Sequence, residues 1–252
     1  MKGFTEFEFD LPDALLASLV RVFDGMEPAS LVPRNVGEIP DAQGVYQLLL
    51  GDHVVYIGKT DAESGLRGRL ERHARTIQHR VKLDPVNVLF KAVRVFVFTA
   101  MDLETQLIRH YGGARSVPWN SSGFGSNDPG RERDTTNLGP AHFDVLYPID
   151  LDREIDIDLP LSAKAGDIIK MLRTKLPYIF RVEGVGPPMR QFHPDLLAAD
   201  VAVPPAPYTT RALVVAIVQA LPPGWQATAL AGRVIMYREQ RDYASGSVIA
   251  RS

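Results

Sequence analysis

Residues 44–60 have the sequence GVYQLLLGDHVVYIGKT, in which two apolar, β-rich runs flank Gly51-Asp52. Glycine at the first position of a two-residue loop is typical of a tight turn between antiparallel strands. We therefore predict a β-hairpin with strands over 44–50 and 53–60. Folding about residues 51 and 52 sets positions that sum to about 103 opposite one another, so Tyr46 and Tyr56 should lie close together with their phenols able to share a face.

The next segment, LRGRLERHARTIQHR (66–80), is compatible with a helix. Arg69 and His73 are four residues apart, a spacing that stacks side chains on one helical face and would direct both toward the hairpin. Between 65 and 82 the only acid is Glu71, against six basic residues at 67, 69, 72, 75, 80 and 82. Arg69 could instead be one charge on a solvated face, and His73 a capped or surface histidine.

A second strand and helix follow. VLFKAVRVFVFTA (88–100) is apolar and β-branched, as expected of a central strand, and MDLETQLIRHYGG (101–113) has helical periodicity that ends at two glycines. Glu104 is in the first turn of this helix. Its carboxylate is the hard oxygen ligand that Mg²⁺ uses when it is held by few protein groups and a substrate phosphate. An acid favoured by the helix dipole is the alternative.

These pieces together resemble the GIY-YIG nuclease superfamily over roughly residues 38–135. The matching elements are Gly44-Val45-Tyr46, Tyr56-Ile57-Gly58, Arg69, Glu104 and Asn120. The Arg69 to His73 spacing and the stretch WNSSGFGSNDPGRERD (119–134) are most similar to the Type II restriction endonucleases that cut CCGCGG. Two departures from the pattern are GVY in place of GIY and the length of the last hundred residues.

The resemblance implies an α+β fold, in which a small, mostly antiparallel sheet is flanked by helices. Outside the matched region, sequence patterns predict an N-terminal helical arm and a C-terminal α+β extension. It also implies Mg²⁺-dependent hydrolysis of DNA, with Mn²⁺ expected to substitute. Glu104 would hold the metal, Arg69 would brace the phosphoryl oxygens, and Tyr46 would orient the attacking water or act as general base. Tyr56 and His73 would share the proton network and Asn120 would fix the geometry.

The identity of the base is open at this point. A phenol has an ordinary pKa of about 10, so Tyr46 would need a nearby cation such as Lys59, Arg69 or the metal to act at neutral pH. His73 would need no such help, since the ordinary pKa of imidazole is near neutrality.

Contacts with double-stranded DNA are expected from five basic residues: Lys59, Arg67, Arg72, Arg131 and Arg133. The last two lie in the segment 112–142, which is rich in Gly, Ser, Asn and Pro and lacks periodicity. Long loops in compact proteins are commonly functional, and arginine is the commonest reader of guanine in the major groove. An exposed, salt-bridged loop is the alternative.

Composition narrows the class of protein. The chain has 252 residues, 45% hydrophobic content, a net charge of -2 and no cysteine. It is therefore long enough to bury a core, and it can form neither disulfides nor zinc ribbons, which fits a cytoplasmic location. No apolar run approaches the ~18 residues of a membrane span, and no basic leader indicates export.

We divide the chain into an arm (1–37) with a helix over 10–24, a nuclease domain (38–142) and a C-terminal region (143–252). In the last region we predict strands over 143–152 and 154–161, a helix over 162–177, a strand over 178–184, a helix over 212–221 and a hairpin over 225–239 turned at Ala231-Gly232. The acidic run 150–158 alternates with Ile and Leu, which favours a half-exposed strand. This region could grip DNA, form a dimer or dock a partner protein.

Three functions are compatible with these features. The first is a site-specific endonuclease that works as a homodimer on a GC-rich palindrome, because a two-fold protein matches a two-fold site. The second is the cutting subunit of a phage-defence or DNA-repair assembly, with the C-terminal half as adaptor. The third is a nuclease-like DNA-binding module without turnover.

Overall fold

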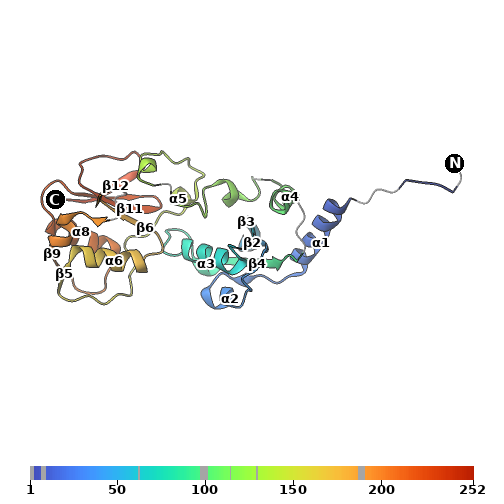
Figure 1. The fold of residues 1–252 in the computed structure, drawn as a ribbon, viewed down its shortest axis with the longest axis horizontal. Coiled ribbons are helices and arrows are strands. Elements are labelled where there is room, and N and C mark those ends of the chain that lie inside the picture. Colours follow the sequence, from blue (N-terminus) through green and yellow to red (C-terminus); the bar gives the residue numbers. More distant parts are fainter. Residues whose placement is uncertain are drawn as a thin grey trace. The chain divides into compact units, whose positions relative to one another are not determined.

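The computed structural model describes residues 3–6, 10–61, 63–96, 102–113, 115–128, 130–186 and 191–252. The protein has an α+β fold that contains two four-stranded sheets. The chain forms two compact units (Figure 1). Unit 1 consists of Met1–Arg75 and Asp84–Ser122, and unit 2 of Thr76–Leu83 and Gly123–Ser252.

Unit 1 is built on an antiparallel sheet of strand order β1-β4-β2-β3. Its elements along the chain are α1 (Leu11–Gly25), β1 (Ala29–Ser30), α2 (Pro33–Gly37), β2 (Gly44–Leu50), β3 (His53–Thr60), α3 (Leu66–Thr76), η1 (Pro85–Asn87), β4 (Val88–Arg94), α4 (Leu103–His110) and η2 (Pro118–Ser121).

The hairpin predicted over 44–60 is confirmed, with Gly51 at φ 59° in its turn. Near the turn, Leu50 faces His53 as expected, but farther along Tyr46 faces Gly58, one position beyond the predicted register. The difference is a β-bulge in β3, since Leu49 pairs with Val54 and Leu48 with Tyr56. A shift of one residue turns side chains to the other face of a strand, so the bulge is what places Tyr56 on the face of Tyr46.

Different helices cover the two faces of this sheet. On the Tyr46 face lies α3, whose Leu66 packs close to Gly44 and whose His73 reaches Tyr46. The other face is covered by α1 and α4 in one apolar cluster: Leu19, Val20, Phe23, Val45, Ile57, Leu103, Leu107 and Val117. The N-terminal helix predicted over 10–24 is thus part of the core of unit 1. Its first turn is capped by Asp10, whose carboxylate accepts a hydrogen bond from Asp13 N.

Unit 2 has a mixed sheet of strand order β12-β10-β11-β6, in which β6 is parallel to β11. Its elements are η3 (Arg131–Arg133), α5 (Phe143–Leu146), β5 (Ser162–Lys164), α6 (Ala165–Lys175), β6 (Ile179–Val182), β7 (Gly184–Val185), β8 (Gln191–Phe192), α7 (Pro194–Ala198), β9 (Asp200–Ala202), α8 (Thr210–Ala220), β10 (Gln226–Leu230), β11 (Arg233–Tyr237) and β12 (Gly246–Arg251).

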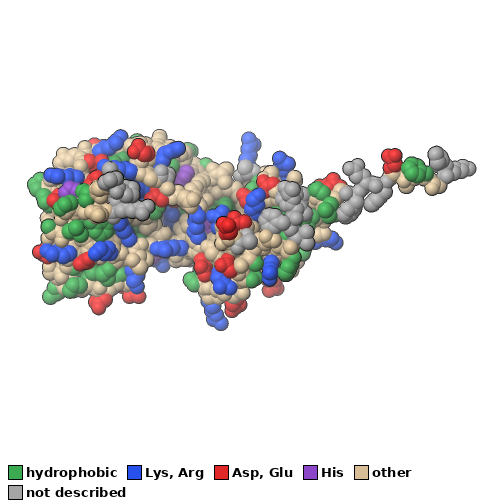
Figure 2. All heavy atoms as spheres, in the orientation of Figure 1, with side chains coloured by type: hydrophobic (Ala, Val, Ile, Leu, Met, Phe, Trp, Pro, Cys, Tyr) green, Lys and Arg blue, Asp and Glu red, His purple; other side chains and the backbone are tan. Residues whose placement is uncertain are grey.

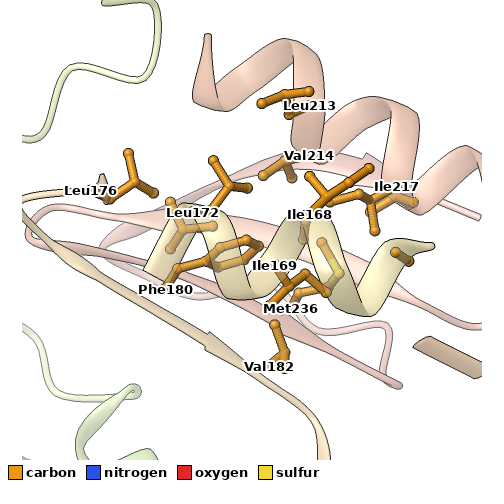
Figure 3. Close-up of a cluster of buried hydrophobic side chains, with 14 of the residues drawn as sticks. Ile168, Ile169, Leu172, Leu176, Phe180, Val182, Leu213, Val214, Ile217 and Met236 are labelled. Atoms are coloured by element: carbon orange, nitrogen blue, oxygen red, sulfur yellow. The ribbon is translucent and has the colours of Figure 1, made fainter. Parts of the chain in front are cut away.

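The core of unit 2 lies between two helices and the sheet (Figure 3). Ile168 and Leu172 of α6 point toward Val214 and Ile217 of α8, and Met236 of β11 lies in the same cluster. All five side chains are fully buried. This cluster has no member in unit 1, so unit 2 has a hydrophobic core of its own.

Several predictions for the C-terminal region are confirmed, namely the helix that becomes α6, the strand β6, the helix α8 and the hairpin β10–β11. The strands predicted over 143–152 and 154–161 are wrong. Phe143–Leu146 is a short helix, and 150–161 makes only isolated backbone bonds, such as Ile155 N to Tyr208 O. Acidic and apolar residues alternate over 150–158 because Leu151 and Ile155 insert into the core from an irregular segment, without a neighbouring strand.

The segment 123–142, which we grouped with the nuclease domain, packs within unit 2. Phe124 stacks edge-on against Phe143, and the buried Asp134 accepts hydrogen bonds from Arg181, Arg233 and Tyr237 Oη. The helix predicted over 66–80 is also shorter, because α3 ends at Thr76 and His79 takes a positive φ of 51°. Residues 97–101 of the predicted strand and helix lie outside the described residues.

Basic side chains are not gathered in one patch on the face seen in Figure 2, where they are interspersed with acidic ones. None of the described helices has the length and apolar character that crossing a bilayer requires.

Candidate active site

Three aromatic rings meet on the α3 face of the unit 1 sheet. Tyr46 is 1% exposed, and its Oη lies 2.8 Å from His73 Nε2. The ring of Tyr56 is 6.0 Å from that of Tyr46 and 5.1 Å from that of His73, measured between centroids. The bulge in β3 and the last turns of α3 thus bring together the two predicted tyrosines and the predicted histidine.

Gly58 makes room for the Tyr46 phenol. A Cβ at Gly58 would lie 2.8 Å from Tyr46 Cε1 and would overlap the phenol carbon Cζ and oxygen Oη still more closely. The backbone of Gly58 does not require glycine on conformational grounds, since its φ is not in the left-handed region. The glycine of the YIG triplet is therefore a packing requirement, because the phenol lies directly across the neighbouring strand.

In the nuclease that the resemblance implies, replacing Gly58 with alanine should displace the Tyr46 phenol and lower the turnover number for DNA cleavage by about 10²-fold, since small misplacements of reacting groups have effects of this size. Gly68→Ala is the matched control, because its Cβ meets no atom within 4 Å on α3. Single-turnover cleavage and circular dichroism of both variants provide the measurement. Parent-like turnover in Gly58→Ala would contradict the packing argument.

Two predicted site residues cap the free edge of β3. Asn120 Oδ1 accepts a hydrogen bond from Ile57 N at 2.8 Å, and its Nδ2 donates to Ile57 O at 2.6 Å. Glu104 Oε2 accepts from Lys59 N at 3.2 Å. Because β3 is an edge strand, these amides have no strand partner on that side, and the two side chains hold the YIG segment in place. Asn120 thus holds the backbone of Ile57 in place.

The single carboxylate of Glu104 fits a Mg²⁺ ion that keeps most of its water ligands. Burial raises the pKa of Glu104, while the amide of Lys59 opposes that shift. One carboxylate oxygen is used by the amide, which leaves the other for a metal. In the described part of the chain, no cluster of three or more His, Cys, Asp or Glu side chains could form a metal cage. Mg²⁺ bound through one or two carboxylates and a substrate phosphate matches this donor set.

The electrostatics correct our expectation for the base. Burial raises the pKa of Tyr46 well above its ordinary value, and the nearby Arg69 only partly opposes that shift. Burial, followed by the positive charges of Arg69 and Arg72, lowers the pKa of His73 to about 3. His73 is therefore a neutral imidazole at pH 7, and neither group is half-ionised there. The two therefore form a hydrogen-bonded pair of neutral groups at this pH.

Acid should weaken unit 1 through His73. Its folded-state pKa of about 3 lies below the ordinary 6.5, so the unfolded chain binds the extra proton, and stability is lost as the pH falls through this window. For each pH unit by which the pH falls within this window, the unfolding equilibrium constant of the parent should rise by up to about tenfold relative to that of His73→Gln.

Urea unfolding at pH 7 and pH 5, followed through Trp119 in a Trp225→Phe background, measures this effect in unit 1. The free energy of unfolding of the parent, relative to that of His73→Gln, should be smaller at pH 5 than at pH 7. An unchanged difference between the two free energies of unfolding would show that His73 is not held neutral by burial.

Arg69 has an unused donor at the centre of the site. It lies one helical turn before His73 on α3 and lowers the pKa values of Tyr46, Tyr56 and His73 through its charge. Its Nε is buried and has no hydrogen-bond partner among the described residues. A buried donor without a partner is costly, and a phosphoryl oxygen would satisfy it.

The predicted DNA contacts in unit 1 have different surroundings. Lys59 is half-exposed and forms a 2.8 Å ion pair with Asp102. Arg67 donates to Ile39 O at 2.8 Å and so holds the segment before β2 in place. Arg72 is partly buried on α3. Burial lowers the pKa of His73 most, Arg69 lowers it next, and the positive charge of Arg72 lowers it least.

The two predicted guanine readers lie in unit 2. Arg131 pairs with Glu183 at 2.9 Å and lies 4.1 Å over the ring of Tyr237. Its geometry matches the alternative of a salt-bridged loop. Arg133 is exposed, and its backbone oxygen accepts a hydrogen bond from Arg233.

Our sequence reasoning missed Asp102. It is the N-cap residue of α4, accepts a hydrogen bond from Thr105 Oγ1 and pairs with Lys59, and the hydrogen bond with Lys59 lowers its pKa to about 2. An aspartate just before an apolar helix is a recognisable capping signal. No sequence pattern indicates that its partner is Lys59, which lies 43 residues earlier in the chain.

Comparison with known proteins returned no match: no family model and no curated protein is significantly similar to this chain.

Proposed function

We propose that this chain is a Mg²⁺-dependent endonuclease of the GIY-YIG superfamily that hydrolyses phosphodiester bonds in DNA. The observation that carries the proposal is the convergence of five predicted residues from four elements of unit 1: Tyr46, Tyr56, Arg69, His73 and Glu104. Arg69 and Glu104 both lie close enough to the phenols to shift their pKa values. A positive charge, a carboxylate and a hydrogen-bonded phenol and imidazole thus lie near one another, as hydrolysis of a phosphodiester requires.

In this mechanism a water molecule attacks phosphorus in line with the leaving 3′-oxygen. Tyr46 Oη, held by its hydrogen bond with neutral His73 Nε2, orients this water, and a nonbridging phosphoryl oxygen takes the proton that the water loses. Arg69 donates to the nonbridging oxygens, where negative charge accumulates. The P–O3′ bond breaks as the new P–O bond forms.

Glu104 would hold the Mg²⁺, and the chemistry supplied by this ion is Lewis-acid stabilisation of the charge on the leaving oxygen. Mn²⁺ is expected to substitute. The finer assignment is a Type II restriction enzyme that acts as a cytoplasmic homodimer on a GC-rich palindrome. Lys59 and Arg72, together with the exposed Arg133 of unit 2, are the proposed additional DNA contacts.

Digestion of supercoiled plasmids by the purified chain tests the proposal, with Mg²⁺, Mn²⁺ and EDTA in parallel. Discrete fragments that share an end sequence are expected, and their absence in EDTA is the control. Smeared products, or cutting only with a partner protein, would favour a subunit of a defence or repair assembly; the separate core of unit 2 suits such an adaptor. Binding without cutting by either metal would overturn the nuclease assignment.

A further inference from the structure

Phe96 is an aromatic side chain held in solvent next to an arginine. It follows β4 in unit 1 and is 77% exposed, and the guanidinium carbon of Arg94 lies 4.4 Å from the centre of its ring. A single exposed apolar residue is ordinary on a protein surface. Here, however, a cation lies over one face of a ring that is largely exposed.

The backbone at this position is held in place. Val95 N donates to Gln43 O at 3.2 Å, and Gln43 Nε2 donates to Val95 O at 3.1 Å. These bonds continue the sheet to Val95, just past the end of β4, so the residue before Phe96 is held in place. A side chain that is presented in this way loses less conformational entropy when it binds a ligand.

Arg94 lies on the same face of the sheet as Tyr46. In the register of β2 and β4, Tyr46 faces Ala92 and Gly44 faces Arg94, so strand alternation directs Arg94 toward the face that α3 covers. A rise of about 3.3 Å per residue puts Arg94 about 7 Å along β4 from the Tyr46 row, and Phe96 follows two residues later. That distance corresponds to about two base steps of a duplex.

We propose that Arg94 and Phe96 form a base-stacking contact that flanks the cleaved phosphate. The Phe96 ring enters a base step of the DNA and stacks on a nucleobase, while Arg94 braces the ring and neutralises a nearby phosphate. This inference rests on the proposed nuclease function. A nucleic acid is the partner that its chemistry fits, because every nucleotide carries a negative charge and an apolar side chain that enters a duplex unstacks a base step and so gains a flat π-face to stack on.

The test is the affinity of the full-length chain for a fluorescein-labelled duplex of mixed sequence, measured by anisotropy in EDTA over a range of salt concentrations. Phe96→Ala should bind about tenfold more weakly with an unchanged salt dependence, since stacking carries no charge. Arg94→Ala should weaken binding and reduce the salt slope by about one. Val86→Ala is the control, because Val86 is 60% exposed and lies before β4, at the other end of the sheet, and it should bind like the parent.

Phe96→Trp provides a direct signal. It should keep the parent affinity, and its fluorescence should be quenched when DNA is added, above the background of the buried Trp119 and Trp225. Parent-like affinity in Phe96→Ala, or an equal loss in Val86→Ala, overturns the contact, while DNA cleavage by the parent would leave the nuclease proposal standing. A parent that neither binds nor cuts DNA overturns both proposals.

Discussion

Replacing Glu104 with alanine should abolish DNA cleavage while leaving DNA affinity within about tenfold of the parent, a margin of ~1.4 kcal/mol. Glu104 is the one carboxylate that we assign to the metal, and no cluster of three or more His, Cys, Asp or Glu side chains in the described residues could replace it. Binding should survive because affinity for DNA is carried by the basic side chains. Cleavage with Mg²⁺ and anisotropy in EDTA separate the two quantities.

Two further variants distinguish loss of the metal ligand from loss of structure. Glu104→Gln keeps an oxygen that can accept the hydrogen bond from Lys59 N but loses the charge, so it should be as inactive as the alanine variant. Asp102→Asn changes the neighbouring carboxylate, which is tied to Lys59 and Thr105, and should retain cleavage within about tenfold. Robust Mg²⁺-dependent cleavage by Glu104→Ala would refute the metal assignment.

Substitution of Arg69 by lysine should lower turnover by at least about 10²-fold, although the positive charge is kept. The buried Nε of Arg69 is the donor that we expect a phosphoryl oxygen to satisfy, and an ammonium group cannot reproduce the planar fork of a guanidinium. Single-turnover cleavage at saturating enzyme isolates the chemical step from binding.

Arg75→Ala is the matched control for this variant, because Arg75 is an exposed arginine on the same helix. It should weaken DNA binding and flatten the salt dependence without changing the single-turnover rate. If Arg69→Lys retained near-parent turnover and only its binding changed, Arg69 would be a general phosphate contact like Arg75.

Local sequence patterns were sufficient for the elements that carry the site. The turn at Gly51-Asp52 predicts the hairpin because glycine readily adopts the positive φ that the turn requires. The four-residue spacing of Arg69 and His73 predicts a shared helical face because helical geometry repeats at that interval. The helix with Glu104 in its first turn follows from the same periodicity. Each prediction depends on neighbours within a few residues.

Local patterns failed where the partners are distant. The acidic alternation at 150–158 looks like a strand, yet its apolar side chains fill the core of unit 2 from an irregular segment. Asn120 holds Ile57, 63 residues earlier, and Asp102 holds Lys59. The protonation of His73 also differed from expectation, because burial outweighs the ordinary basicity of imidazole.

By itself the sequence determined the α+β class, the hairpin, and the helices that bear Arg69, His73 and Glu104, because turn chemistry and side-chain periodicity act over a few residues. The sequence also predicted that Tyr46 and Tyr56 lie close together, but only the tertiary structure decided how they share a face, since that depends on a one-residue bulge that strand alternation does not reveal. It also decided that the Tyr46 phenol fills the space left by Gly58 and that His73 stays neutral. Packing and desolvation depend on segments that meet only when the chain is folded.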